Sequence, residues 1–270
     1  MKTGVSTASL FLRKNNEDAL PLLNGLGVKT AEVFLTSFSE YGEAFAKLLA
    51  SRKGDLSVNS VHILNTEFEP QFFNLHPRAR ADAYAWLEKV LDGANILGAK
   101  HYTFHGIARV KRASRSGEHD DIVRMIENFR PLISACENRG VRLCLENVEW
   151  ATYNRAGLFS LIKNELPSLL GVLDIKQARI SEYPYEAYIE DMGERLAYAH
   201  LSDIDEHGKI RLPGQGVFDF EMLIKRLKDA GFDGALLIEV YTGDYGQESE
   251  LKIACDFLDE LLYKHGVLSK

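Results

Sequence analysis

Short apolar runs alternate with longer amphipathic segments along most of the chain. The runs are four to seven residues long and rich in Val, Ile, Leu and Ala, which is typical of strands that are buried on both faces. We expect eight strands, at Gly4–Thr7, Ala31–Leu35, Val58–Leu64, His101–His105, Val141–Glu146, Leu169–Asp174, Ala197–Leu201 and Ala235–Val240.

The segments between these runs have the periodicity of helices. Their apolar residues recur three or four positions apart and so share one face of a helix, while charged residues occupy the other positions. Several strands follow a glycine turn (LGVK, LGAK, NRGV and AGFDG), where glycine supplies the left-handed conformation that ends a helix. The apolar positions at this spacing are Ala83, Leu87, Val90, Leu91, Ala94 and Leu97; Ile122, Ile126, Phe129 and Ile133; Phe220, Leu223, Ile224 and Leu227; and Leu251, Ala254, Leu258 and Leu261.

Eight strands that alternate with helices, at roughly 34 residues per unit, predict an α/β protein: a single (β/α)8 TIM barrel over residues 1–270. The structural alternative is a doubly wound open sheet. That fold usually carries a glycine-rich phosphate loop after its first strand, and the segment found here, STASLFLRKN, is not such a loop. We therefore favour the closed barrel.

Two polar stretches, Lys111–Asp120 and Asp203–Gly216, are predicted to be long loops. Loops that follow the strands of a barrel lie on its catalytic face, so both are candidate active-site lids. The alternative is that they are solvated surface loops. Of the two, we favour the second stretch as the functional one.

The composition narrows the class of protein. A net charge of −7 argues against a polyanionic partner such as nucleic acid. Three scattered cysteines with apolar neighbours, Cys136, Cys144 and Cys255, indicate buried reduced thiols rather than a disulfide framework. The first residues lack the apolar core of a signal peptide, and no run approaches the ~18 apolar residues that span a membrane. We expect a cytoplasmic protein without a membrane partner.

Four strand ends carry side chains that can bind a metal ion. Glu146, Asp174 and Glu239 each close an apolar strand, and His200 lies near the end of another. A carboxylate in this position is costly to desolvate without a cation, a proton or hydrogen-bond donors. Taken singly, each has a simpler explanation as a helix cap, an ion-pair partner or a packed histidine. As a set of three carboxylates and one imidazole, they predict one divalent metal ion: Mn²⁺, Mg²⁺, Co²⁺ or Zn²⁺.

Two further histidines, His62 and His105, end earlier strands, where a substrate oxygen or a second cation could lie. Ordinary hydrogen-bonded histidines at the barrel rim are the alternative. Glu32, within TAEVFL, is either an acid at the rim or a buried ion-pair partner.

These residues lie in motifs that resemble the xylose isomerase-like barrel superfamily, which includes sugar isomerases and 3-epimerases, inositol-pathway dehydratases and isomerases, and endonuclease IV-type DNA repair enzymes. The resemblance spans nearly the whole chain. It implies metal ligation by Glu146, Asp174, His200 and Glu239, with Glu146 and Glu239 also moving protons. The motifs are CLENVEW around Glu146, GVLDIKQA around Asp174, AYAHLSD around His200, GQGVFDF at 214–220 and FDGALLIEVY around Glu239.

The chain departs from this family at three positions. The family often has a histidine three residues after the strand-six aspartate, where this chain has Gln177, so the resemblance implies substrate contact there rather than metal ligation. The endonuclease branch has an Asp-x-His before its Gly-x-Gly, where this chain has Gly208 and Ile210. A single-metal site therefore fits better than a three-metal cluster. The epimerases also tend to use an arginine in the loop after strand seven, for which Arg211 is a candidate beside Lys209.

The sequence thus predicts a divalent-metal-dependent sugar or sugar phosphate isomerase or epimerase. A bound cation would stabilise a cis-enediolate as a Lewis acid, while Glu146 and Glu239 act as acid and base. The same groups could run a dehydratase of an inosose- or shikimate-type substrate. An endonuclease IV-like phosphodiesterase is disfavoured by the missing ligands and the acidic charge. A sugar-binding barrel without catalytic activity is the third class.

Substrate contacts are expected from His62, His105, Trp150, Gln177 and Arg211. Besides Trp150, the aromatic residues Tyr153 and Tyr241 follow strand ends and are candidates to pack against a sugar ring or to shield the site from water. For all three, packing at the barrel rim is the alternative. The basic residues Lys176, Arg155 and Arg211 are scattered and form no obvious phosphate cradle. Whether the sugar is phosphorylated, and whether the protein is a homo-oligomer, are left open by the sequence.

Overall fold

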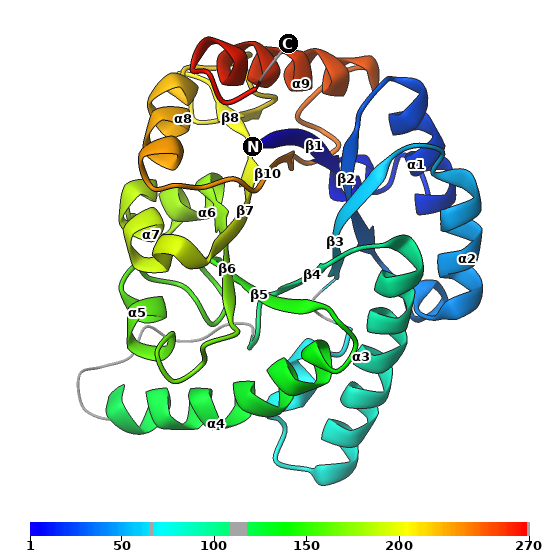
Figure 1. Ribbon diagram of the computed structural model, residues 1–270, viewed down its shortest axis with the longest axis vertical. Coiled ribbons are helices and arrows are strands. Elements are labelled where there is room, and N and C mark those ends of the chain that lie inside the picture. The colour runs from blue at the N-terminus through cyan, green and yellow to red at the C-terminus, as the bar shows by residue number, and fades with distance from the viewer. Residues whose placement is uncertain (65–66, 108–117, 269–270) are drawn as a thin grey trace.

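Eight parallel strands form a closed barrel in the computed structural model, which describes residues 1–64, 67–107 and 118–268. The strands follow each other around the barrel in chain order, and the last one pairs with the first. Figure 1 shows these strands at the centre of the molecule with helices around the outside. The predicted (β/α)8 barrel is confirmed.

Each barrel strand begins and ends within two residues of its predicted position. The largest differences are at the first strand, which begins two residues earlier, and at the last, which ends two residues earlier. His105 and Glu239 therefore lie one residue beyond the strands that were expected to contain them. The strands are β1 (Lys2–Ser6), β2 (Thr30–Leu35), β3 (Ser57–Ile63), β4 (His101–Phe104), β5 (Arg142–Glu146), β6 (Leu170–Asp174), β7 (Leu196–Leu201) and β10 (Ala235–Ile238).

The helices pack their apolar faces on the outer face of the barrel. In α3, the predicted apolar face from Ala83 to Leu97 is buried, and Gly98 follows it in the left-handed conformation, with φ +79°. The α-helices are α1 (Asn16–Gly25), α2 (Glu43–Arg52), α3 (Pro77–Leu97), α4 (Glu118–Glu137), α5 (Leu158–Ile162), α6 (Ile175–Ile180), α7 (Tyr185–Met192), α8 (Phe220–Asp229) and α9 (Ser249–Lys264). Short 3-10 helices lie at Thr7–Leu10, Phe38–Glu40, Glu69–Phe73 and Gly193–Arg195. No helix in these ranges is long and apolar enough to cross a membrane.

The predicted loop Asp203–Gly216 is more ordered than expected. Its first half forms a small antiparallel hairpin, in which β8 (Asp203–Ile204) pairs with β9 (Ile210–Arg211). Residues 111–117 of the other predicted loop, Lys111–Asp120, lie outside the described residues, and α4 begins at Glu118.

Candidate metal centre and cavity

The candidate metal ligands form the upper of two layers inside the barrel. Side chains two residues apart on a strand point to the same face, so each strand places its inward residues one above the other. The lower layer is apolar in character and contains Cys144, Val172, Tyr198 and Leu237, which pack together in a small cluster. Two residues further along the same four segments are Glu146, Asp174, His200 and Glu239. The lower layer therefore closes the barrel beneath the polar one.

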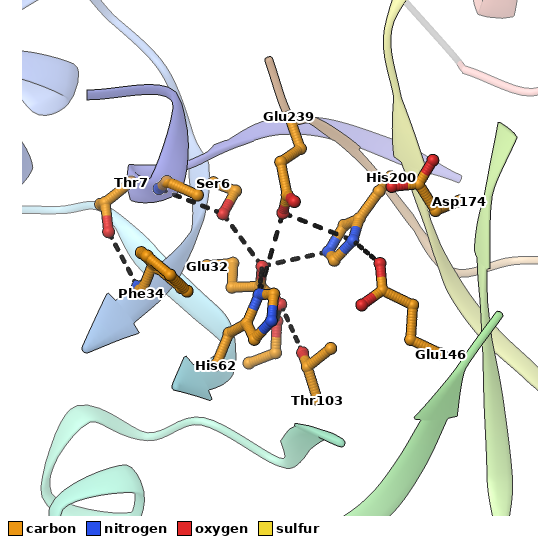
Figure 2. Close-up of polar contacts among 12 residues, drawn as sticks. Ser6, Thr7, Glu32, Phe34, His62, Thr103, Glu146, Asp174, His200 and Glu239 are labelled. Carbon is orange, nitrogen blue, oxygen red and sulfur yellow. Dashed lines mark hydrogen bonds and ion pairs between the residues drawn. The ribbon is translucent and has the colours of Figure 1, made fainter. Parts of the chain in front are cut away.

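The four residues of the upper layer converge. Each offers a ligand atom, and these atoms lie within 4.8 Å of one another. Nδ1 of His200 is 2.7 Å from Oε1 of Glu146 and 3.4 Å from Oε2 of Glu239, so the imidazole lies between the two glutamates. Figure 2 shows these side chains pointing toward a common centre. All but Glu239 are at most 2% exposed.

His62 and His105 lie next to this group. Their Nε2 atoms are 2.9 Å apart, and Nε2 of His105 is 3.3 Å from Oε2 of Glu146. Together with Glu146 they form a second set of ligand atoms that lie within 4.8 Å of one another. A third such set combines Glu32 and His62 with His200 and Glu239. The histidines that sequence analysis left undecided are thus part of the same polar cluster.

Glu32 is the buried ion-pair partner that the sequence analysis offered as one of two alternatives. It is completely buried, and its Oε1 lies 3.0 Å from Nε2 of His200 and 3.2 Å from Nδ1 of His62. The same carboxylate accepts hydrogen bonds from the hydroxyls of Ser6, Ser60 and Thr103. Since Nε2 of His200 faces Glu32, Nδ1 is left to face the other carboxylates. A carboxylate that orients a histidine in this way is typical of the surroundings of a metal site.

Two positioning residues were not singled out from the sequence. Glu69, in the 3-10 helix after β3, is completely buried, and its Oε2 lies 3.2 Å from Nδ1 of His105. Because Nδ1 faces Glu69, Nε2 of the same histidine points toward Glu146. Asn147 clamps the end of β6: its Oδ1 accepts from the backbone N–H of Asp174 at 2.7 Å, and its Nδ2 donates to the carbonyl of Asp174 at 2.9 Å. The only sequence signal was the position of Asn147 within CLENVEW.

The charges in the cluster shift its pKa values strongly. Burial opposes ionisation of Glu32, but His200 and His62 outweigh it and hold its pKa well below the usual range. For His200, burial disfavours the charged form, yet Glu239, Glu32 and Glu146 together raise its pKa well above the usual value. Asp174 differs from Glu32: burial is the largest cause that raises its pKa, to about 6, although Lys176 lowers it. Without a cation, the surrounding carboxylates thus favour the protonated form of His200.

These residues fit a divalent cation. Oε2 of Glu239 is buried and has no hydrogen-bond partner among the described residues. Nε2 of His200 also lacks a hydrogen bond of good geometry there, although it lies close to Glu32. Three carboxylates and one imidazole are ligands that Mn²⁺, Mg²⁺, Co²⁺ and Zn²⁺ accept. Glu146, Asp174, His200 and Glu239 would hold such an ion.

A cavity of about 500 Å³ lies above the upper layer. One part of its wall is apolar, and another carries the candidate ligands and their polar neighbours. An amphipathic molecule such as a sugar has faces of both kinds. The apolar and aromatic lining includes Ala8, Phe11, Phe34, Ile63, Leu64, Val148, Trp150, Val240 and Tyr241, and the polar lining is His62, His105, Glu146, Asp174, Lys176, Gln177 and Glu239.

Of the five predicted substrate-contact residues, the structure brings four to this cavity. His62, His105, Trp150 and Gln177 line it, and the Trp150 ring stacks on the His105 ring with their centroids 5.6 Å apart. Arg211 is not part of the wall. It lies on β9, where its guanidinium forms an ion pair with Asp205 at 2.9 Å.

The aromatic candidates also divide. Tyr241 lines the cavity and is 61% exposed, whereas Tyr153 is completely buried and donates a hydrogen bond to Asp191. Of its two alternatives, Tyr153 follows packing within the barrel rim rather than contact with a sugar ring. It follows a strand end, as Trp150 does, but its side chain packs among α5 and α7 residues such as Phe159 and Tyr188.

The comparisons with known proteins agree with this architecture. The sequence profile of the xylose isomerase-like TIM barrel family matches residues 20–261. Fructoselysine 3-epimerase of Escherichia coli O157:H7 is 26% identical over 127 residues, which is 44% of this chain and 46% of that protein. Inosose dehydratase of Klebsiella pneumoniae (strain 342) is 21% identical over 239 residues, 77% of this chain and 80% of that protein.

Among solved structures, this chain superposes on D-psicose 3-epimerase of Clostridium cellulolyticum H10, which was solved with D-tagatose, with a TM-score of 0.79. The two chains are 18% identical, and the superposition covers 97% of this chain and 99% of the epimerase chain. This likeness shows a shared fold. The matched segment covers less than half of the fructoselysine 3-epimerase chain, so activity does not follow from it. The family match covers most of the chain and includes every candidate ligand. The chain belongs to the xylose isomerase-like TIM barrel family.

Proposed function

We propose that this protein is a divalent-metal-dependent isomerase or epimerase of a sugar or sugar phosphate. The observation that carries the proposal is the upper layer of the barrel, where Glu146 and Glu239 flank His200 at the bottom of a cavity. The similarity to fructoselysine 3-epimerase and to the fold of D-psicose 3-epimerase supports it.

The two glutamates are suited to move a proton between two sites of a sugar. Glu146 ends β5 and Glu239 follows β10, and these strands are separated in the barrel by β6 and β7. A substrate between them meets one carboxylate on each side, so one can remove the proton on carbon while the other returns it. Return to the opposite face of the same carbon gives an epimer, and return to the neighbouring carbon gives an isomer. A divalent cation held by the upper layer supplies Lewis acidity toward the substrate's carbonyl oxygen.

The surroundings support this chemistry in two ways. His200 and His105 lie within 3.3 Å of the Glu146 oxygens and hold the carboxylate in place. Trp150 and Tyr241 at the cavity wall cover part of the substrate, which limits the access of water to a carbanion-like intermediate.

A dehydratase is the second candidate. The match to inosose dehydratase covers 77% of this chain, a larger share than the epimerase match. Abstraction of a proton next to a carbonyl is common to both reactions, and the dehydratase then expels a β-hydroxyl group. The two differ in product: only dehydration gives a conjugated product that absorbs in the ultraviolet.

The test is a solvent deuterium exchange assay on metal-loaded protein with ketoses and inosose-type substrates. Wild type should incorporate deuterium at the carbon next to the carbonyl. Glu146→Gln and Glu239→Gln should each reduce exchange by about 10²–10⁴-fold, because an amide keeps the shape of the side chain but is a very poor base.

Metal occupancy is measured in each variant. Glu88→Gln serves as the matched control, because this glutamate is 53% exposed on α3. If the wild-type protein binds a sugar but exchanges none of its protons with solvent, the protein is a sugar-binding barrel without this activity. If the metal-loaded double variant Glu146→Gln, Glu239→Gln exchanges protons as fast as wild type, neither glutamate takes part in proton transfer.

A further inference from the structure

Lys176 is a buried cation that the proposed reaction does not yet use. It lies two residues after Asp174, in the first turn of α6, and only 6% of the residue is exposed. It is one of the residues that line the cavity. A buried lysine is uncommon unless its charge meets a partner.

The described residues give the Lys176 ammonium no hydrogen bond. Its Nζ lies 3.8 Å from Oδ2 of Asp174, which is an ion-pair distance beyond hydrogen-bonding range. Tyr241 lies beside it, with Nζ 4.6 Å from the ring centroid. Since an ammonium group has three N–H donors, these donors are left for a molecule in the cavity.

Asp174 is also engaged elsewhere. Its Oδ1 accepts a hydrogen bond from the backbone N–H of Gln177 at 2.8 Å, and the carboxylate belongs to the group that converges with Glu146, His200 and Glu239. A cation held by that group would take up much of the negative charge that faces Lys176. The ammonium would then keep its own charge and have free donors at the cavity wall.

We propose that Lys176 binds a negatively charged oxygen of the substrate, at or next to the carbon that loses its proton. The short distance from Nζ to Asp174 places that oxygen beside the candidate metal centre. The negative charge has two possible sources. It can be a carboxylate that the substrate always carries, or it can develop on the carbonyl oxygen during proton abstraction. This inference rests on the proposed function and deepens it.

The experiment compares Lys176→Met with wild type and uses Arg179→Met as the matched control. Arg179 lies one turn further along α6 and does not line the cavity, so its substitution removes the same charge from the same helix outside the site. Three kinds of measurement are made. The first is the affinity for Mn²⁺, and the second is the affinity of the Mn²⁺-loaded protein for glycolate and for uncharged 1,2-ethanediol. The third is the kcat and KM of deuterium exchange.

In Lys176→Met, glycolate should bind about 10- to 100-fold more weakly, because a hydrogen bond to a charged group is lost. The affinity for Mn²⁺ should stay equal or rise, since a positive charge next to a ligand is removed. The affinity for 1,2-ethanediol should change less than about 3-fold, and Arg179→Met should behave as wild type. Lys176→Arg, which keeps the charge, should bind glycolate better than Lys176→Met.

If Lys176 only holds Asp174 in place, the opposite change in metal affinity is expected. Mn²⁺ affinity would then fall, and both small ligands would weaken with it. That result overturns the inference, as does unchanged glycolate binding in Lys176→Met, or a wild-type protein that prefers 1,2-ethanediol to glycolate.

The kinetic measurements identify the source of the charge. A lower kcat with neutral ketoses and a nearly constant KM supports charge that develops during the reaction. Weaker glycolate binding with unchanged kcat for neutral ketoses supports a substrate that carries a carboxylate. If wild type exchanges no proton with any substrate, the proposed function fails, while glycolate binding still decides the role of Lys176.

Discussion

Glu32 shows how one buried carboxylate orders several groups around it. It has two histidine partners and three hydroxyl donors, which come from β1, β3, β4 and β7. Figure 2 shows its carboxylate between Ser6, His62 and His200. The negative charge of Glu32 therefore has two roles: it balances the positive charge of the protonated imidazole of His200, and it fixes the direction in which His200 points.

Glu32→Gln should lower the free energy of unfolding of the metal-free protein by about 3–5 kcal/mol, because it removes one partner of a buried charged cluster. Metal affinity should fall by about 10- to 100-fold, since His200 loses the carboxylate that orients it. Urea unfolding and a Mn²⁺ titration measure the two effects. Glu88→Gln should change stability by less than about 0.5 kcal/mol. If Glu32→Gln matches this control in both measurements, Glu32 has no organising role.

At the scale of residues, sequence analysis could find the side chains that lie on regular strands. Glu146, Asp174 and His200 follow an apolar residue by two positions, so their direction is determined by the strand itself. Glu69 could not be found in this way, because it contacts His105 across 36 residues from a 3-10 helix whose path no local pattern determines. Arg211 was predicted to contact the substrate but lies outside the cavity wall, because a position in a loop does not determine the direction of a side chain.

At the scale of elements, one buried carboxylate joins the β8–β9 hairpin to the segment that follows it. Asp203 is 2% exposed and accepts hydrogen bonds from the backbone N–H groups of Ile204, Gly214, Gly216 and Phe218. The glycines have steric reasons to be there: Gly214 has φ +88°, and a Cβ on Gly216 would lie 2.2 Å from the carbonyl oxygen of Ile204. This explains the motifs AYAHLSD and GQGVFDF as two parts of one structure.

Asp203→Ala should therefore loosen the segment from β8 to α8. We expect a loss of about 1.5–3 kcal/mol in the free energy of unfolding and faster protease cleavage between residues 205 and 218, because four backbone donors lose a charged acceptor. Glu206→Ala, an exposed position in the turn of the same hairpin whose side chain has no hydrogen bond or ion pair with the described residues, is the control. Equal cleavage rates in wild type and Asp203→Ala would show that other contacts hold the hairpin.

The barrel strands were more predictable than the hairpin for a physical reason. A run of buried apolar residues is long enough to show a pattern, whereas β8 and β9 contain two residues each. Their pairing depends on Asp203 and on the turn at Gly208, which has φ +84°. Neither feature gives a periodic signal.

At the scale of the whole molecule, the three cysteines report on how tightly the barrel is packed. They are at most 3% exposed and form no disulfide, as expected from their apolar neighbours. Burial raises the pKa of Cys136 and of Cys255 to about 12. The native thiols therefore stay protonated at pH values at which an unfolded chain has already formed thiolate.

The native protein should react very slowly with a thiol reagent, at a rate that stays nearly constant between pH 7 and pH 9, while the unfolded protein reacts faster as the pH rises. Above pH 9 the unfolded state releases these protons before the native state does, so stability should fall with rising pH. Labelling followed by mass spectrometry, with and without urea, measures the rates. Rapid native labelling at pH 7 would contradict the packing described.

The pairing of β1 with β10 also bears on when the candidate site comes into existence during protein synthesis. Glu239 follows β10, the last strand to be made, and that strand must enter between β7 and β1 to close the barrel. The nascent chain carries Glu32 and His62 long before Glu239, whose Oε2 lies 3.8 Å from Nδ1 of His62, has been translated. The barrel can close only after its last strand has left the ribosome. We therefore expect metal binding to follow barrel closure and not to guide the folding of the first strands.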